Sequence, residues 1–313
     1  MSEAVPASDH AAAEHLRDRF RGMLLGLALG DALGAAVQHR RPGTFSRVGD
    51  LLGGGPYDLP RGAWSDDAAT ALMCAESVID CGELNLNDVI DRWDRWRRSG
   101  LGSSTGRCLG ISAAMAAALS PHGGDLASRV LDAEPFPRAA VVAAFEFAEP
   151  ARAVGAARSL ASLTHSDASV LDATSAYALL IVGALQGLSH DTLWDAVSDD
   201  VAIQSAARPQ RVDITEATAA SSDALSVLSL VYNATVSAHS YKESVLMAVN
   251  AGRSADVAGA ATGALAGALY GAQSLPPHWL AALIDRAVIE ACADRLLVAA
   301  LTRLMDDSTG RTA

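Results

Sequence analysis

Apolar side chains recur at helical spacing along almost the whole chain. Phe20, Met23, Leu24, Leu27 and Leu29 show the pattern near the start, where every third or fourth position is apolar. No stretch alternates with a period of two over a useful length, so we expect an all-α fold without a sheet. The spacing predicts helices over 16–30, 32–37, 65–79, 86–98, 110–119, 139–147, 151–163, 169–187, 191–198, 213–238, 241–250, 256–270, 277–291 and 293–305.

Small residues dominate the apolar positions and indicate closely packed helices. Half of the 313 residues are hydrophobic but only 5% are aromatic, and the apolar weight falls on Ala, Leu and Val. Small side chains let helix backbones approach one another. No repeat, linker or shift in composition marks a second domain. We therefore expect one compact domain over 15–305, with a disordered leader at 1–14 and a disordered tail at 306–313.

The formal charge of −12 changes the picture in one respect. Such a balance repels phosphate backbones, which argues against a nucleic-acid partner. It leaves two interpretations open: an acidic surface that serves solubility, or acidic residues gathered into a cation site.

The cysteines and the N-terminus point to a cytoplasmic protein. Cys74, Cys81, Cys108 and Cys292 form no metal-binding or disulfide framework. Residues 1–14 lack the basic-then-apolar pattern of a signal peptide, and the longest apolar runs are unconvincing as membrane spans. We therefore expect no membrane association.

Two acidic segments could carry chemistry. Ser65-Asp66-Asp67 offers a hydroxyl and two adjacent carboxylates, an oxygen set suited to Mg²⁺ or Mn²⁺, although the start of a helix explains the same residues. Asp256 stands at the start of a second helix, whose glycines fall four residues apart. That stripe predicts close contact with another helix. Its members are Gly259, Gly263, Gly267 and Gly271.

Two further segments are weaker candidates. The polar loop 103–110 leads into a helix and contains Cys108, which is either a packing residue or a nucleophile with Arg107 as its sequence neighbour. His165 follows Thr164 after an apolar stretch, where a structural histidine and a functional one are both plausible.

In this order, the motifs resemble the ADP-ribosylglycohydrolase family. That family includes dinitrogenase reductase-activating glycohydrolases, ADP-ribosylarginine and ADP-ribosylserine hydrolases, and J1 crystallins. The resemblance runs from about Arg19 to Leu280. The segments that carry it are Arg21 to Gly34, Trp64 to Asp67, Thr164-His165, Ala248 to Gly271 and Pro276 to Leu280.

The resemblance implies an all-helical fold with two Mg²⁺ or Mn²⁺ ions at the base of an ADP-ribose cleft. Its two acidic motifs correspond to 65–68 and 254–257 of this chain. By that correspondence, the metal ligands are Ser65, Asp66, Asp67 and Asp256. Ser254 stands where an Asp is expected, and Ala68 and Val257 replace hydroxyl residues. A reduced site with one ion, or with none, is therefore expected.

The resemblance also implies departures in the catalytic groups. Gln38 replaces a Glu, and Cys108-Leu109-Gly110 replaces a motif that begins with a catalytic Asp. Asp66, Asp67 and Asp31 remain as catalytic candidates. Arg138 is the one remnant of a further family motif, and the loop 39–62 offers arginines for a pyrophosphate, namely Arg40, Arg41 and Arg61. The expected ligand contacts are Gln38, Ser104, Thr105, Gly106, Cys108, Gly110, His165, Gly252 and Ser254.

Two functions follow as alternatives. The first is hydrolysis of the glycosidic bond in an ADP-ribosylated or related nucleoside substrate. The second is a catalytically inactive relative that binds ADP-ribose or a nucleotide, or acts as a scaffold.

Overall fold

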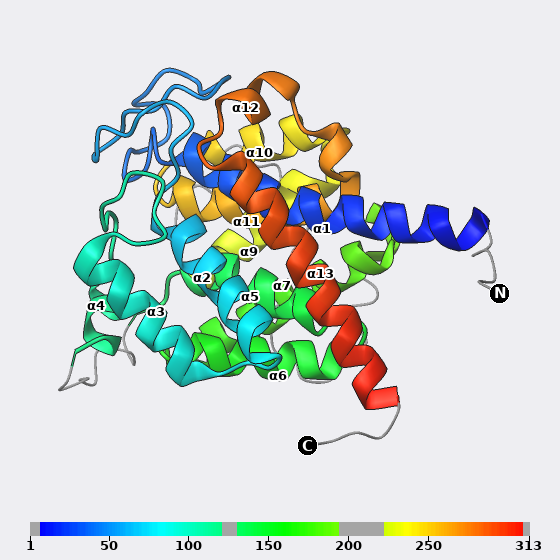
Figure 1. The fold of residues 1–313 in the computed structure, drawn as a ribbon. Coiled ribbons are helices and arrows are strands. Elements are labelled where there is room, and N and C mark those ends of the chain that lie inside the picture. Colours follow the sequence, from blue (N-terminus) through cyan, green and yellow to red (C-terminus); the bar gives the residue numbers. More distant parts are fainter. Residues whose placement is uncertain (1–6, 121–129, 194–221, 309–313) are drawn as a thin grey trace.

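The protein is built from helices around a central pair (Figure 1). The computed structural model describes residues 7–120, 130–193 and 222–308. Within these ranges β-structure is limited to two isolated bridges, Gly54–Leu59 and Asp132–Asp223, so the all-α prediction is confirmed. The helices are α1 (Ala7–Gly34), α2 (Asp66–Cys81), α3 (Leu86–Ser99), α4 (Ala113–Ala118), α5 (Pro135–Phe145), α6 (Pro150–Ala161), α7 (Ala168–Gln186), α9 (Ala224–Val236), α10 (Tyr241–Val249), α11 (Ala255–Tyr270), the 3-10 turn η4 (Ala272–Ser274), α12 (Pro277–Ala282) and α13 (Arg286–Ser308).

The central pair consists of α1 and α11, which run antiparallel with their glycines face to face. A Cβ atom at Gly26 would lie 2.2 Å from the carbonyl oxygen of Gly263, and one at Gly263 would lie 2.0 Å from that of Gly26. Gly22 and Gly30 of α1 meet Gly267 and Gly259 of α11 equally closely. The predicted close contact is thus confirmed for Gly259, Gly263 and Gly267. Gly271, which ends the helix with a positive φ of 77°, also lies against α1, because a Cβ atom there would lie 2.0 Å from Asp18 Oδ2.

This pairing fixes where two carboxylates lie. Gly34 of α1 lies against the backbone of Ala255, so the C-terminal end of α1 meets the N-terminal end of α11. Asp31 and Asp256 therefore occupy the same end of the helix pair. The remaining helices cover the pair: α7, α9 and α10 pack on α11, while α13 crosses α1 and α2 on the outside (Figure 1).

Helix α7 is the most apolar long helix. By length and composition it could cross a membrane, but 78% of its most apolar window is buried inside the protein. Tyr177 of α7 stacks on Phe136 of α5, with ring centroids 4.9 Å apart, and its hydroxyl donates to the Ala261 carbonyl. These contacts are those of a core helix, which is compatible with a soluble protein.

Several helix boundaries differ from the predicted ones. Helix α1 begins at Ala7, inside the expected leader, because residues 7–14 are rich in alanine, the strongest helix former. It also runs without a break to Gly34. Helix α5 begins earlier than predicted, at Pro135, because proline suits the first helical position. At the other end of the chain, α13 extends to Ser308, into the expected tail.

Tertiary contacts explain the break between α12 and α13. The backbone of Ile284 bonds to Gly62, and its carbonyl accepts a hydrogen bond from the Trp64 indole. Asp285 follows with a φ of 57°, so the helix stops here instead of near position 292. Parts of two predicted helices, 194–198 and 213–221, lie outside the described residues.

Candidate functional site

Asp31 of α1 caps the N-terminus of α2. Its carboxylate accepts hydrogen bonds from the Ser65 amide (3.0 Å), the Ser65 hydroxyl (2.6 Å) and the Ala68 amide (2.8 Å). Ser65 itself makes no side-chain cap bond, so the cap expected from its own hydroxyl is supplied by another helix. Both Asp31 oxygens are thereby engaged, and the Ser65-Asp66-Asp67 segment is held against the end of α1.

Four acidic side chains meet at this point: Asp31, Asp66, Asp67 and Asp256. Burial, together with the charge of Asp256, raises the pKa of Asp31 to about 7. Burial also raises the pKa of Asp66 and of Asp67 well above the ordinary value, and the other carboxylates of the group add to the effect. The pKa of Asp256 is raised chiefly by burial. The fold therefore holds together acidic groups that repel one another.

One carboxylate oxygen of this group lacks a hydrogen-bond donor among the described residues. Asp67 is 2% exposed, and its Oδ2 accepts no hydrogen bond from any residue that the structure describes. A buried carboxylate oxygen without a donor is costly, and a bound hard cation removes that cost. Ser65, Asp66, Asp67 and Asp256 are thus residues that could hold Mg²⁺ or Mn²⁺.

The turn after α1 forms one wall of the site. Gln38 is buried, and its Oε1 has no partner among the described residues. Burial and the charge of Asp66 raise the pKa of Tyr57, which also hydrogen-bonds to Gln38. The turn is tied to the start of α11, because the His39 amide bonds to the Arg253 carbonyl (2.6 Å) and the Arg253 amide to the Arg40 carbonyl (2.7 Å).

The loop after α3 forms a second wall, as expected for part of 103–110. Gly110 lies directly against Asp66, because a Cβ atom there would come within 2.0 Å of Oδ1. Burial and the charge of Asp66 raise the pKa of the Cys108 thiol, which disfavours a nucleophilic role. The Ser104 hydroxyl is used for bracing, since it accepts from the Trp64 amide (3.1 Å) and donates to the Trp64 carbonyl (2.6 Å).

A third wall carries two carboxylates that the sequence interpretation missed, Asp132 and Glu134. The charge of Glu134 adds to that of the acidic group at Asp66 and Asp67, and the charge of Asp132 acts on Asp256. Glu134 accepts hydrogen bonds from the Ser112 hydroxyl (2.6 Å) and the Arg138 guanidinium (3.0 Å). It is therefore fixed beside the acidic group.

His165 connects this wall to the core. It is fully buried, with Nδ1 2.8 Å from the Thr164 hydroxyl and Nε2 3.1 Å from Asp132 Oδ1. Burial favours a higher pKa for Asp132, but hydrogen bonding to His165 holds that pKa below its ordinary value. Asp132, Glu134 and His165 each offer a ligand atom within 4.8 Å of the others, so among the described residues they form a group that could hold a metal ion, whereas the expected ligands Asp66, Asp67 and Asp256 do not form such a group.

Arg138 and several of the remaining expected ligand residues make contacts within the protein. Arg138 is fully buried and bonds to Glu134 and Thr164. Gly252 packs on the Arg40 carbonyl, and Ser254 makes no side-chain capping bond at the start of α11. Thr105 and Gly106 lie in the turn that packs on Gly100.

Two of the arginines expected at a pyrophosphate are occupied within their own loop. Arg40 donates to the Thr44 carbonyl, and Arg61 donates to the Leu51 carbonyl. Arg41 is exposed.

One signal in the sequence pointed to the missed residues. Asp132 and Glu134 stand two apart, six and four residues before Arg138, and Glu134 directly precedes Pro135; such acidic residues are typical of a helix start. Their position at the site depends on the packing of α5 against α2, which the local pattern does not contain.

Fold and site together define an all-helical protein with a buried acidic group. The chain matches the ADP-ribosylglycohydrolase family over residues 12–305, and it belongs to that family. The family is of the hydrolase type and depends on metal in general.

Named relatives support the assignment. The chain is 28% identical to the ADP-ribosylarginine hydrolase Tri1 of Serratia proteamaculans, over 89% of this chain and 79% of that protein. It is 29% identical to the Tri1 protein of Pseudomonas putida, over 85% and 74%. A solved structure described as an ADP-ribosylglycohydrolase-related protein complex superimposes with a TM-score of 0.79 at 33% identity, covering 92% of this chain and 99% of that one.

Proposed function

We propose that this protein hydrolyses the glycosidic bond between ADP-ribose and an acceptor, with a divalent cation held by Ser65, Asp66, Asp67 and Asp256. The observation that carries the proposal is the unpartnered, buried Oδ2 of Asp67 within a group of four carboxylates. Arginine is the favoured acceptor, because two relatives are named as ADP-ribosylarginine hydrolases.

The residues divide into positioning and reacting groups. Both carboxylate oxygens of Asp31 accept hydrogen bonds from Ser65 and Ala68, so Asp31 fits a positioning role better than the activation of water. Asp66 and Asp67 remain as groups that can take a proton from water, and Glu134 is a further carboxylate beside them. A bound cation would polarise the ribose and lower the pKa of a water.

The bond to be broken joins C1″ of the ribose to the acceptor. Water adds its oxygen to C1″ and gives a proton to a carboxylate, while the acceptor leaves with the bonding electron pair and takes up a proton. The products are ADP-ribose and the free acceptor. Gln38 and Cys108 cannot supply the carboxylates that the family resemblance implies at their positions, so Asp66, Asp67 or Glu134 must do so.

The direct test is calorimetric titration of Mg²⁺, and then of ADP-ribose, into metal-stripped protein, followed by an assay for release of ADP-ribose from an ADP-ribosylated arginine substrate. Asp67→Asn is expected to abolish both the binding of Mg²⁺ and the release of ADP-ribose. Asp91→Asn removes the same charge from an exposed position on α3 and is expected to change neither. Release that is independent of Mg²⁺ and of Asp67 would contradict the proposed site.

A second function rests on the neutral residues in the site. Gln38 and Cys108 line two walls, and Ser254 lies at the start of α11, where the resemblance implies acidic groups. They favour an inactive protein that binds ADP-ribose or a nucleotide. Binding of ADP-ribose without release from any ADP-ribosylated substrate would support this alternative.

A further inference from the structure

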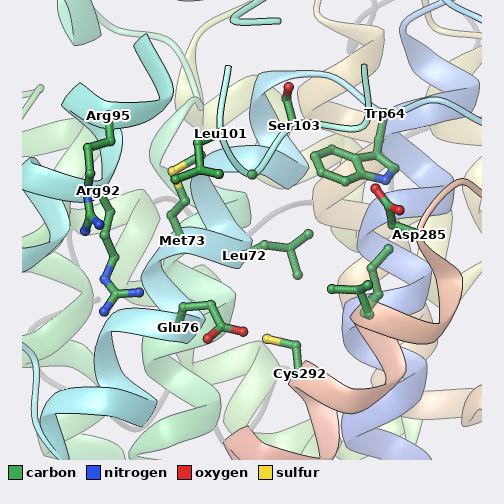
Figure 2. A pocket seen from close by; sticks show the side chains of 13 residues that line it. Trp64, Leu72, Met73, Glu76, Arg92, Arg95, Leu101, Ser103, Asp285 and Cys292 are labelled. Atoms are coloured by element: carbon green, nitrogen blue, oxygen red, sulfur yellow. The ribbon is translucent and has the colours of Figure 1, made fainter. Parts of the chain in front are cut away.

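A cavity of about 380 Å³ lies behind the acidic segment, on another face of α2. It is bounded by α2, by the first turns of α13 and by the loop that follows α3 (Figure 2). A volume of this size is within the range of small-molecule sites, and it is too small for a helix or a folded partner. Apolar side chains dominate its lining: Trp64, Leu72, Met73, Val288, Ile289 and Cys292.

The rim of this cavity leaves apolar surface in contact with water. Leu101 is 63% exposed and Val288 is 62% exposed, although both line a cavity whose floor residues Ile289 and Cys292 are buried. Apolar side chains gathered around a hollow apolar surface are a feature of small-molecule sites. The apolar body of a ligand would cover both of them.

Charges at the rim favour an acidic ligand. Arg92 and Arg95 of α3 lie at one end of the cavity (Figure 2). Arg92 is paired with Asp80 and Asp88. Arg95 bonds through Nε to the Asp91 carbonyl, and no carboxylate of the described residues lies within ion-pair distance of it. Its guanidinium is therefore available to a ligand carboxylate.

The acidic residues of the same cavity are offset. Glu76 is paired with Arg295 and accepts a hydrogen bond from the Cys292 thiol. Asp285 is exposed and directly precedes α13, where the partial positive charge of the helix N-terminus offsets part of its charge. Arg95 is thus the cation of this lining that no carboxylate of the described residues pairs with, whereas the acidic group on the other side of the segment gathers several carboxylates.

We propose that this cavity binds a small carboxylic acid with an aryl or branched alkyl body. The body fills the space between Trp64 and Val288, and the carboxylate pairs with Arg95. The site is separate from the acidic group, which would repel such an anion, and the proposal does not depend on catalysis there.

The test uses 4-phenylbutyrate as the probe, titrated into the full-length protein by calorimetry, with 4-phenylbutanol as its uncharged counterpart. Saturable binding of the acid to one site is expected. Arg95→Gln should weaken binding of the acid by about fivefold, the scale of one exposed charge pair, and leave the alcohol unchanged.

A matched pair of variants locates the site. Val288→Glu places a negative charge at the rim and should weaken binding of the acid by at least about tenfold. Val298→Glu makes the same change at a residue that is 63% exposed on the same helix, about 15 Å further along, and should have no effect. Both positions are exposed, so neither variant endangers folding.

Three results would overturn the proposal. They are no saturable binding of 4-phenylbutyrate by the unmodified protein, an equal loss of affinity for the acid in the two valine variants, or an equal loss of affinity for the acid and the alcohol in Arg95→Gln. A protein without hydrolase activity would leave all these expectations unchanged, so this test and that of the hydrolase function fail independently.

Discussion

Two regions of the central helix pair, its length and one of its ends, are built on opposite principles. Along its length, α1 meets α11 through glycines, with carbonyl oxygens so close that a single methyl group would not fit. At its end the same two helices bring together Asp31 and Asp256 beside Asp66 and Asp67, where burial raises the pKa of each carboxylate. The first region is apolar and closely packed, and the second is charged and leaves an oxygen without a donor.

The comparison shows how the closely packed region stabilises the acidic one. Carboxylates that repel one another stay together only when the surrounding structure cannot separate them. The glycine contact leaves no room for α1 and α11 to shift, and it therefore holds Asp31 and Asp256 at a fixed distance. The packed region supplies rigidity, and the acidic region uses it.

The largest effect is expected from Gly263→Ala in the middle of the contact. Its methyl group would lie 2.0 Å from the Gly26 carbonyl oxygen, so the helices must separate. We expect a loss of about 3 kcal/mol or more in the free energy of unfolding, measured by urea denaturation, because a packed core accommodates added volume poorly.

The matched control for this variant is Gly155→Ala. Gly155 is exposed within α6, and nothing lies within 4 Å of the position that its Cβ would take. There the substitution should stabilise the protein by about 0.5–1 kcal/mol, since alanine is the better helix former. Equal effects at the two positions would contradict the role given to the contact between α1 and α11.

Asp67→Asn tests the acidic region. Without cation the variant should be more stable than the parent protein by about 1–2 kcal/mol, because it removes one of four repelling charges. With Mg²⁺ at 100 times its Kd, the parent should gain about 2.7 kcal/mol and the variant nothing. Thermal unfolding with and without Mg²⁺ measures both effects, and an equal gain in the two proteins would place the cation elsewhere.

A smaller effect on stability is expected at Asp294, a carboxylate that is paired with two arginines. Hydrogen bonds from Arg17 and Arg21 hold the pKa of Asp294 well below its ordinary value. Its contribution of about 1 kcal/mol is therefore present above the unfolded-state pKa near 4 and is lost as the pH falls towards the lowered folded-state pKa. The stability difference between the parent and Asp294→Asn should be full at pH 7 and shrink below about pH 4, as followed by urea denaturation at each pH.

The sequence contained most of the fold and part of the site. Helical spacing and the four-residue glycine period are local patterns, so the helices and the packing face of α11 could be predicted. Asp31 as the cap of α2, and Glu134 beside Asp66 and Asp67, depend on contacts between segments far apart in the chain. The surroundings of His165 depend on such contacts too: the resemblance suggested a ligand contact there, and the structure gives the buried ring Thr164 and Asp132 as partners.

The glycine contact also bears on the order in which the chain assembles. Helix α1 ends at Gly34 and α11 begins at Ala255, so all the residues between them must be synthesised before the two helices can meet. Contacts between distant segments of this kind form slowly, and until then the glycine face of α1 lacks α11 as its partner. The acidic group is therefore a late product of folding, incomplete in nascent chains that have not yet reached residue 256.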